Sequence, residues 1–425
     1  MMPERPHPES AEAEPSRSRH PEPIALAEAE AILDATLAGH HLPIESQPLD
    51  QARGRVLAQT LPAPMPLQPF DNAAMDGYAV RAADLDAGTP TRLRLIGECF
   101  AGPSRALRVA PGQCIRITTG AALPDGADTV VIRENSRVLG DWIELSAGTV
   151  PGANVRRAGE DLAEGEIALS AGQRLDPVRL GLAAALGFAT LPVYRRPQAV
   201  VFASGDELRP AGQPLAAGEI HDSNGPMLAA LLAEDGVEVE RGAILPDDPE
   251  QIRRQLDQAA ERADLILTCG GVSAGDRDHL PAVLAAHGAI RFWRVRLKPG
   301  MPVLLGLWRG VPVLGLPGNP VSVLACYLVL GRRLLQRLQG CSEPPLELSA
   351  QLDAAIDKRH SRLEFQRGLL RCDRHGQLRV LASPVVGSHR LAAAARSNAL
   401  IRLPEPPARF EAGQAITVLP YGPLV

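Results

Sequence analysis

The stretch DLILTCGGVSAGDRD, residues 264–278, joins a short apolar run to a glycine-rich turn that ends in acidic residues. Such a run followed at once by glycines is typical of a buried strand that ends in a tight turn. The stretch VPVLGLPGNPVS, residues 311–322, repeats the pattern, with Asn319-Pro320 placed to begin a helix. Two strand ends of this kind predict an α/β sheet whose polar loops gather on one edge.

The residues around these two stretches, 197–340, alternate strand-like runs with helical patterns. The run QAVVFA precedes SGDEL, and VEVERGAIL precedes Asp248-Pro249, a pair that suits the N-cap and first position of a helix. This alternation predicts a parallel sheet with crossover helices. Ligands bind at the carboxyl ends of the strands in such sheets, so we expect the functional site on that edge.

The full chain of 425 residues is too long for one hydrophobic core. Outside the α/β region, turn-rich short strands predict β-rich domains, and helical spacing predicts helices near residues 24–37 and 49–61. We therefore predict a multidomain α/β plus β protein. Its predicted parts are a disordered extension (1–23), an elongated discontinuous domain (24–64 and 145–196), a β-rich domain (65–144), the α/β domain (197–340) and a C-terminal small β-barrel (341–425).

Composition excludes several classes of protein. The net charge is −5 without a long basic run, which argues against a nucleic-acid surface. The six cysteines form no CxxC pair, so we expect reduced thiols rather than a disulfide framework or a zinc knuckle. No apolar run reaches the roughly 18 residues of a membrane span, and the N-terminus lacks the apolar core of a signal peptide. The expected location is therefore cytoplasmic.

Two glycine-containing turns at the predicted edge favour anion binding. The first lacks GK[ST] and does not match GxGxxG, so a phosphate or pterin site is favoured over a P-loop or a dinucleotide fold. The second begins a helix, whose positive dipole end favours anions. A purely structural turn remains the alternative for both. The predicted binding residues are Gly270, Gly271, Ser273 and Gly275 in the first turn and Pro317, Gly318, Asn319 and Pro320 in the second.

Charged residues follow the same strand ends. Carboxylates beside a bound anion usually need a cation, and Mg²⁺ prefers oxygen ligands. Each acid alone also suits a helix cap or a turn. Lys298 adds a positive charge for an anionic substrate, and Arg367 and Ser388 contribute from the last domain. The acids are Asp206, Glu207, Asp222, Asp247, Asp248, Asp276 and Asp278.

The stretch FDNAAMDGYAV, residues 70–80, combines apolar and acidic residues in neither a helical nor a strand pattern. A strand edge with an Asx-turn explains it structurally. Its two acids cannot form an active site unaided, so a functional role requires another domain or another subunit.

Eight motifs together give the chain a family resemblance. From residue 24 to 425 it resembles the MoeA family of molybdopterin molybdenumtransferases, which also includes the gephyrin E domain. No motif alone is as specific as the ordered set. The motifs are FDNAAMDGYAVR, RITTGAALPDGADTVV, NVRRAGED, ASGDEL, HDSN, GGVSAGDRD, KPGMP and GLPGNPVSV.

The resemblance implies insertion of molybdate into adenylated molybdopterin with release of AMP. It also implies a homodimer whose active sites are shared between subunits, with the elongated domain at the dimer interface and the pathway's adenylyltransferase as a candidate partner. The family positions for activity fall on Asp76, Thr119, Asp161, Glu207, Asp248 and Asp278, with Mg²⁺ held by Glu207, Asp248 and Asp278. Those lining the pterin and molybdate region fall on Lys298, Pro317, Pro320, Arg367 and Ser388.

This chain departs from the family pattern at Met301 and Pro281, where many members have lysine. Three alternatives stay open from the sequence: the preceding adenylyltransferase step, a non-catalytic scaffold of the gephyrin kind, and an enzyme that takes tungstate.

Overall fold

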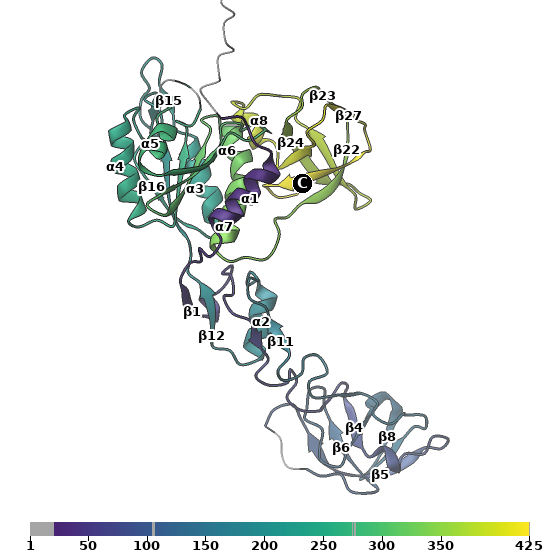
Figure 1. The fold of residues 1–425 in the computed structure, drawn as a ribbon. Coiled ribbons are helices and arrows are strands. Elements are labelled where there is room, and N and C mark those ends of the chain that lie inside the picture. The colour runs from purple at the N-terminus through teal and green to yellow at the C-terminus, as the bar shows by residue number, and fades with distance from the viewer. Residues whose placement is uncertain (1–20, 104–106, 274, 276–277, 425) are drawn as a thin grey trace, which may run out of the picture. The chain divides into compact units, whose positions relative to one another are not determined.

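The computed structural model describes residues 21–103, 107–273, 275 and 278–424 (Figure 1). Asp276 and most of the predicted N-terminal extension therefore lie outside the described residues. The chain divides into two compact units, one of residues 1–44 and 194–425 and one of residues 45–193. No helix in the described ranges has the length and apolar character needed to cross a membrane.

A six-stranded sheet forms the centre of the first unit. Its strand order is β16, β13, β17, β21, β20, β18. The first four strands are parallel, as the sequence predicted, whereas β20 and β18 are antiparallel additions that the sequence pattern did not reveal. Their bounds are β13 Gln198–Ala203, β16 Glu238–Arg241, β17 Leu265–Cys269, β18 Ala289–Trp293, β20 Leu304–Trp308 and β21 Val311–Leu316.

Helices cover both faces of this sheet, because β13, β17 and β21 are almost wholly buried and need apolar cover on each side. One core contains leucines of α3 and α6, and a separate core contains Ile252 and Leu256 of α4 with Val283 and Leu284 of α5. The helices are α3 Asn224–Glu234, α4 Pro249–Ala260, α5 Leu280–His287, α6 Pro320–Cys326 and α7 Arg332–Leu338, with a π turn at Tyr327–Gly331 between the last two.

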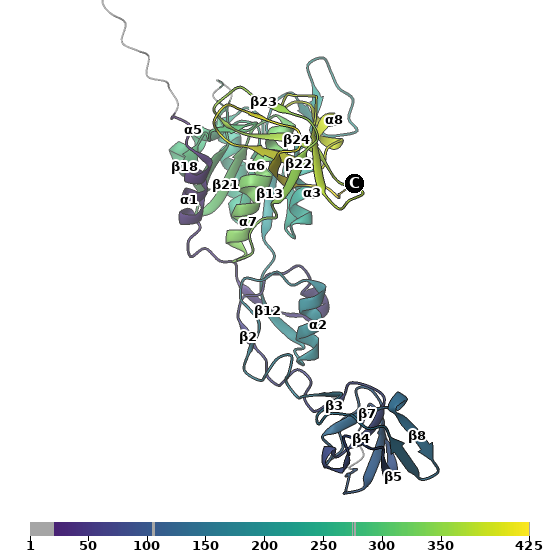
Figure 2. The same cartoon turned by 90° about the vertical axis from the view of Figure 1, so that its right-hand side faces the viewer.

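Helix α1 (Leu26–Thr36) belongs to this α/β unit, which corrects the predicted assignment of residues 24–44 to the elongated domain. Leu26, Ala29 and Leu33 join the same core as the sheet and α7. Asp34 binds Arg333 and Arg337 of α7, and both views place the two helices side by side (Figures 1 and 2). The apolar face of α1 therefore packs against the helices of the sheet. Helical spacing predicts that α1 has an apolar face but not which domain this face contacts.

The C-terminal part closes into a small β-barrel, as predicted. Its strands pair in a ring of β24, β25, β22, β28 and β26, with β26 returning to β24. β19 (Leu297–Lys298) adds to β24 in parallel and so connects the barrel with the KPGMP segment. The bounds are β22 Leu348–Leu352, β24 Leu363–Cys372, β25 Leu378–Ala382, β26 Ala399–Leu403 and β28 Ala415–Pro420, with β23 Ile356–Lys358, β27 Ala408–Phe410 and α8 Leu391–Ala395 at its margins.

The second unit contains a six-stranded sheet ordered β7, β4, β6, β5, β9, β8, with separate cores on its two faces. This agrees with the β-rich domain that the sequence predicted. The strands are β4 Gly77–Val80, β5 Thr91–Cys99, β6 Gln113–Ile117, β7 Thr129–Ile132, β8 Ser136–Leu139 and β9 Trp142–Leu145, and short pairs are formed by β3 Asn72–Ala73 with β10 Val155–Arg156, β2 Leu61–Pro62 with β11 Ile167–Leu169, and β1 Ile44–Pro48 with β12 Thr190–Tyr194.

The predicted helix at 49–61 is wrong. Only Leu49–Gln51 form a helical turn, of the 3₁₀ type. Gly54 then takes a positive φ of 74°, and Val56 and Leu57 form bridges to Arg174 and Val193. The apolar residues of this segment instead pack in a separate hydrophobic core together with residues of α2 (Pro177–Ala185). The predicted N-cap of α2 at Asp176 is confirmed.

Candidate functional site

The four loops that follow the parallel strands contact one another. Ser204, after β13, forms a bridge with Leu245, after β16. The side chain of Asp206 accepts a hydrogen bond from Asp247 N (3.2 Å). In the same way, Asn224 Nδ2 donates to the carbonyl of Gly318 (2.7 Å), which links the HDSN and PGNP motifs. The predicted gathering of polar loops on one sheet edge is therefore present.

The glycine-rich turn after β17 requires glycine for steric reasons. Gly270 has a φ of 100°, and a Cβ there would lie 2.5 Å from the carbonyl oxygen of Ser204. Gly271 also has a positive φ. Within the turn, Gly275 N donates to Asp278 Oδ2 (2.9 Å), so this N–H already has a partner. Of the four residues predicted to bind an anion here, Ser273 reaches the large cleft described next.

A cleft of about 490 Å³ lies between this sheet edge and the barrel. Its size suits a small-molecule ligand, for which pockets of roughly 300–1,000 Å³ are usual. Predicted residues that line it are Ser273, Lys298, Pro317, Gly318, Asn319, Arg367 and Ser388. Gly270, Gly271, Gly275 and Pro320 are not among its lining residues, and they shape the loops behind it. Met301 also lines the cleft and presents a thioether where lysine is common in the family.

Arg367 is the most unusual residue of the cleft. Only 6% of it is exposed, and its Nη1 and Nη2 donate to the carbonyls of Gly387 (2.9 Å) and Val385 (2.5 Å). Its Nε is buried without a hydrogen-bond partner, and no carboxylate of the described residues pairs with it. Burial lowers the pKa of this guanidinium, which nevertheless stays charged in proteins. A buried cation without a counter-ion favours an anionic ligand.

Two further charged residues of the cleft were missed by sequence reasoning. Arg362 lines it, and Glu364 lies opposite Lys298 in the pairing of β19 with β24. Lys298 Nζ lies 3.1 Å from Glu364 Oε1. The motif KPGMP was visible in the sequence, but its pairing with a barrel strand was not, so no local signal pointed to Glu364.

The sequence predicted an anion site at the start of helix α6, and the first N–H groups of this helix already have partners. Pro320 has none, Val321 N donates to the carbonyl of Ser388, and Ser322 N and Val323 N donate to the carbonyl of Asn319. Ser388 therefore joins the barrel to the helix start. The positive charge of the cleft comes from side chains instead.

The three acids predicted to hold Mg²⁺ are all on the sheet edge. Within the described ranges, no three His, Cys, Asp or Glu side chains are close enough together to form a metal site by themselves. Mg²⁺ is commonly held by one or two carboxylates together with substrate phosphates, so a protein cluster is not required. Glu207 is exposed, with its carboxylate against Gly205, and Asp278 accepts one hydrogen bond from its own loop. These hard oxygen donors fit Mg²⁺.

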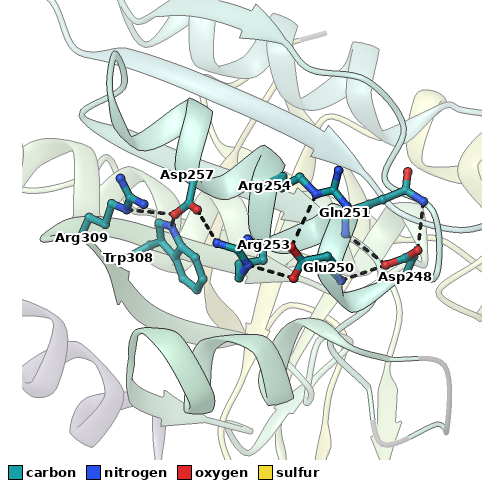
Figure 3. A network of polar contacts seen from close by, with 8 residues as sticks. All are labelled: Asp248, Glu250, Gln251, Arg253, Arg254, Asp257, Trp308 and Arg309. Atoms are coloured by element: carbon teal, nitrogen blue, oxygen red, sulfur yellow. Dashed lines mark hydrogen bonds and ion pairs between the residues drawn. The ribbon is translucent and has the colours of Figure 1, made fainter.

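Asp248 has a second role as the N-cap of α4 (Figure 3). Its Oδ1 accepts from Glu250 N (2.9 Å) and Gln251 N (3.1 Å), and its Oδ2 accepts from Gln251 Nε2 (3.0 Å). The bond from the Gln251 side chain and the two backbone bonds lower the pKa of Asp248. A carboxylate offers about four lone-pair sites, so the three bonds leave Asp248 capacity for a single metal bond.

Figure 3 shows that hydrogen bonds and ion pairs continue from this cap along α4. Glu250 binds Arg253 (2.7 Å), and Arg253 binds Asp257 (2.9 Å). Asp257 in turn accepts from Trp308 Nε1 (3.0 Å) and pairs with Arg309 (2.9 Å). The loop that carries Asp248 is thus fixed to the sheet through its own helix.

In the second unit, the structure brings together the predicted residues Asp76 and Thr119. Asp76 Oδ1 accepts from Thr119 N and Thr119 Oγ1, both at 2.8 Å. The backbone bond and then the hydroxyl bond lower the pKa of Asp76, with Arg133 and Arg116 adding favourable charge. The result is an exposed, ionised carboxylate in a fixed orientation.

The NVRRAGED motif lies beside the same segment. β10 pairs with β3, and Asp71 accepts from Arg157 Nη1 (2.6 Å) and Ala158 N (2.8 Å). Asp161 is exposed, next to Leu162, which forms a bridge with Leu67. Asp71 therefore links the two motifs structurally, and the role of Asp161 stays a prediction.

Comparisons with known proteins cover nearly the whole chain. Residues 24–187 match the MoeA N-terminal region (domain I and II), 200–337 a probable molybdopterin binding domain, and 349–421 the MoeA C-terminal region (domain IV). A molybdopterin molybdenumtransferase of Haemophilus influenzae is 36% identical over 89% of this chain and 94% of its own length. The chain belongs to the MoeA family. The molybdopterin molybdenumtransferase 2 of Mycobacterium tuberculosis is 38% identical over 87% of this chain and 93% of its own length.

Solved MoeA structures agree with this fold. The crystal structure of the molybdopterin biosynthesis moeA protein from Pyrococcus horikoshii OT3 is 28% identical and has a TM-score of 0.81. The match covers 94% of this chain and all of that one. The recognition of the MoeA family from ordered motifs is thus confirmed, together with the α/β plus β fold class.

Proposed function

We propose that this chain is a molybdopterin molybdenumtransferase, which inserts molybdate into adenylated molybdopterin and releases AMP. The observation that carries the proposal is the buried guanidinium of Arg367 in a ligand-sized cleft, together with relatives of that name over most of the chain. A buried cation of this kind is stabilised by an oxyanion, which supplies the counter-charge and an acceptor at once.

The charge of the cleft suits molybdate. Among the described lining residues, Lys298, Arg362 and Arg367 bring three positive charges and Glu364 one negative charge, a net of two positive charges. Molybdate is a tetrahedral dianion, so the two charges match. The hydroxyls of Ser273, in the glycine-rich turn, and of Ser388, in the last domain, add donors to the lining.

The reaction needs positioning and charge stabilisation more than a covalent nucleophile. The two dithiolene thiols replace one oxygen of molybdate, which leaves with their protons as water. Attack on the phosphoanhydride by an oxygen of molybdate or of water breaks its P–O bond and releases AMP. Glu207, Asp248 and Asp278 are the proposed Mg²⁺ ligands, and the ion would offset phosphate charge when bound. Lys298 and Arg367 orient the oxyanion in the cleft.

The carboxylate of Asp76 is the proposed contribution of a second copy of the chain. The protein acts as a homodimer in this proposal, and the Asp76 loop of one subunit completes the strand-end site of its partner. The fixed Asp76–Thr119 pair supports this, because an ionised and oriented carboxylate on an exposed loop suits a site completed by association.

The test is AMP release from adenylated molybdopterin by the purified protein. We expect release only when molybdate and Mg²⁺ are both present. Release without molybdate would contradict the transferase proposal, and no release under any condition would favour a binding protein. Replacing molybdate with tungstate in the same assay measures metal preference.

A further inference from the structure

Glu364 lies where the barrel meets the cleft. It is the second residue of β24, and its partner in the parallel pairing with β19 is Lys298. Only 8% of its side chain is exposed, although it lines the cleft. A nearly buried carboxylate beside an oxyanion site is costly, so its partners are informative.

Both oxygens of Glu364 are engaged. Oε1 lies 3.1 Å from Lys298 Nζ, and Oε2 lies 2.8 Å from His360 Nε2. Lys298 is 42% exposed at its side chain and is the partner that faces the cleft. The carboxylate therefore joins a residue of the cleft to a residue behind it.

His360 acts as a neutral donor in this arrangement. Its Nδ1 is buried without a hydrogen-bond partner. An unpartnered N–H at this position would cost more than an unprotonated nitrogen, so the proton is placed on Nε2, which faces Glu364. Burial lowers the pKa of His360, despite the nearby Glu364. Lys358 fixes the turn by donating to the carbonyls of His360, Glu405 and Pro406. Lys298 is therefore the cation in direct contact with Glu364, and the buried Lys358 interacts with the same carboxylate through space.

We propose that Glu364 is a positioning residue that holds Lys298 in the cleft and, by cancelling one of the three positive charges on the described lining residues, matches the cleft to a dianion. The part of this inference that concerns turnover rests on the proposed function. The part that concerns molybdate affinity needs only anion binding in the cleft. The incoming oxyanion competes with Glu364 for Lys298. The Lys298–Glu364 pair therefore lowers the affinity of the cleft for molybdate while it keeps the Lys298 side chain in its orientation.

The experiment measures molybdate binding by calorimetry, without any pterin, and turnover by AMP release. In Glu364→Gln, which keeps the shape but removes the charge, we expect molybdate to bind roughly three- to tenfold more tightly, with a steeper dependence on salt. Turnover at saturating molybdate should fall because Lys298 is less well held. Glu347→Gln is the matched control, since Glu347 pairs with Arg402 in the same barrel and does not line the cleft.

Glu364→Asp separates the two effects, because it retains the charge but is one methylene shorter. We expect near-normal molybdate affinity and reduced turnover. Unchanged or weaker molybdate binding in Glu364→Gln would overturn the charge-matching role, and unchanged turnover in either variant would overturn the positioning role. If Glu364→Gln does not fold, the turnover of Glu364→Asp still decides the positioning role. If the wild-type protein shows no turnover, the proposed function fails while the binding arm still tests Glu364.

Discussion

The Asp76 loop and the Arg367 cleft place opposite charges in opposite environments. Asp76 is an exposed anion held by two donors of a neighbouring loop, whereas Arg367 is a buried cation with an unpartnered Nε. Exposed charges are screened by water, and buried ones interact strongly with a ligand. We therefore expect the cleft to bind an oxyanion without help, and the Asp76 loop to matter only when a partner surface excludes water.

The largest expected loss of turnover comes from a change at the buried Arg367. Arg367→Lys keeps the charge but loses the forked bonds to Gly387 and Val385. We expect turnover to fall on the order of 10³-fold, with much weaker molybdate binding, because oriented donors supply most of such stabilisation. AMP release and calorimetry measure both losses, and a thermal melt separates them from unfolding. Wild-type molybdate affinity in this variant would remove Arg367 from the site.

A change at the exposed Asp76 should lower the rate of turnover without changing the affinity for molybdate. Asp76→Asn keeps an acceptor for Thr119 but removes the charge, and we expect AMP release to fall on the order of 10²-fold. Molybdate binding to the cleft should be unchanged. Asp86→Asn is the matched control, because Asp86 is also an exposed turn residue that accepts two backbone N–H groups in the same unit. Equal rates in the two variants would argue against Asp76.

A third variant separates helix capping from Mg²⁺ binding. Asp248→Ala and Asp176→Ala both remove an aspartate N-cap before proline, and each should cost about 1 kcal/mol of stability. Only Asp248→Ala should also raise the Mg²⁺ concentration needed for half-maximal turnover. Chemical denaturation and Mg²⁺ titrations give the two quantities. An unchanged Mg²⁺ requirement would restrict Asp248 to its capping role.

The smallest effect concerns the docking of α1. Partial burial would raise the pKa of Asp34, but bonds from Arg337 and Arg333 outweigh it and lower the value to about 2. The stabilisation is therefore present above the usual aspartate pKa and is lost as pH falls from about 3.8 toward 2. Asp34→Asn should cost only about 1 kcal/mol at pH 7, since solvent screens such pairs. Equal unfolding free energies for both proteins at pH 7 in low salt would contradict this assignment.

The sequence was sufficient for elements that local chemistry determines. The strand Leu265–Cys269, the turn at Gly270 and Gly271, and the caps at Asp176 and Asp248 follow from apolar runs, glycine and the Asp-Pro pair. The family resemblance supplied Asp76 and Thr119 among six activity positions, and the structure joins these two by two hydrogen bonds.

Features that depend on distant pairing were not predictable. Glu364 faces Lys298 only because β19 adds to β24, and the N–H of Val321 is occupied only because Ser388 of the barrel reaches it. The segment 49–61 has apolar spacing that fits a helix, yet Gly54 turns the chain and the apolar residues pair with remote strands. In each case the deciding contact is remote in sequence.

The most direct test of the shared active site mixes two inactive chains. Asp76→Asn and Arg367→Lys, carrying different affinity tags, are expressed together, and the doubly tagged dimer is isolated. If one subunit's Asp76 completes its partner's cleft, one of the two sites in this dimer is intact. We predict about half of the wild-type rate of molybdate-dependent AMP release, with each parent variant nearly inactive. A mixed dimer as inactive as its parents would contradict the account.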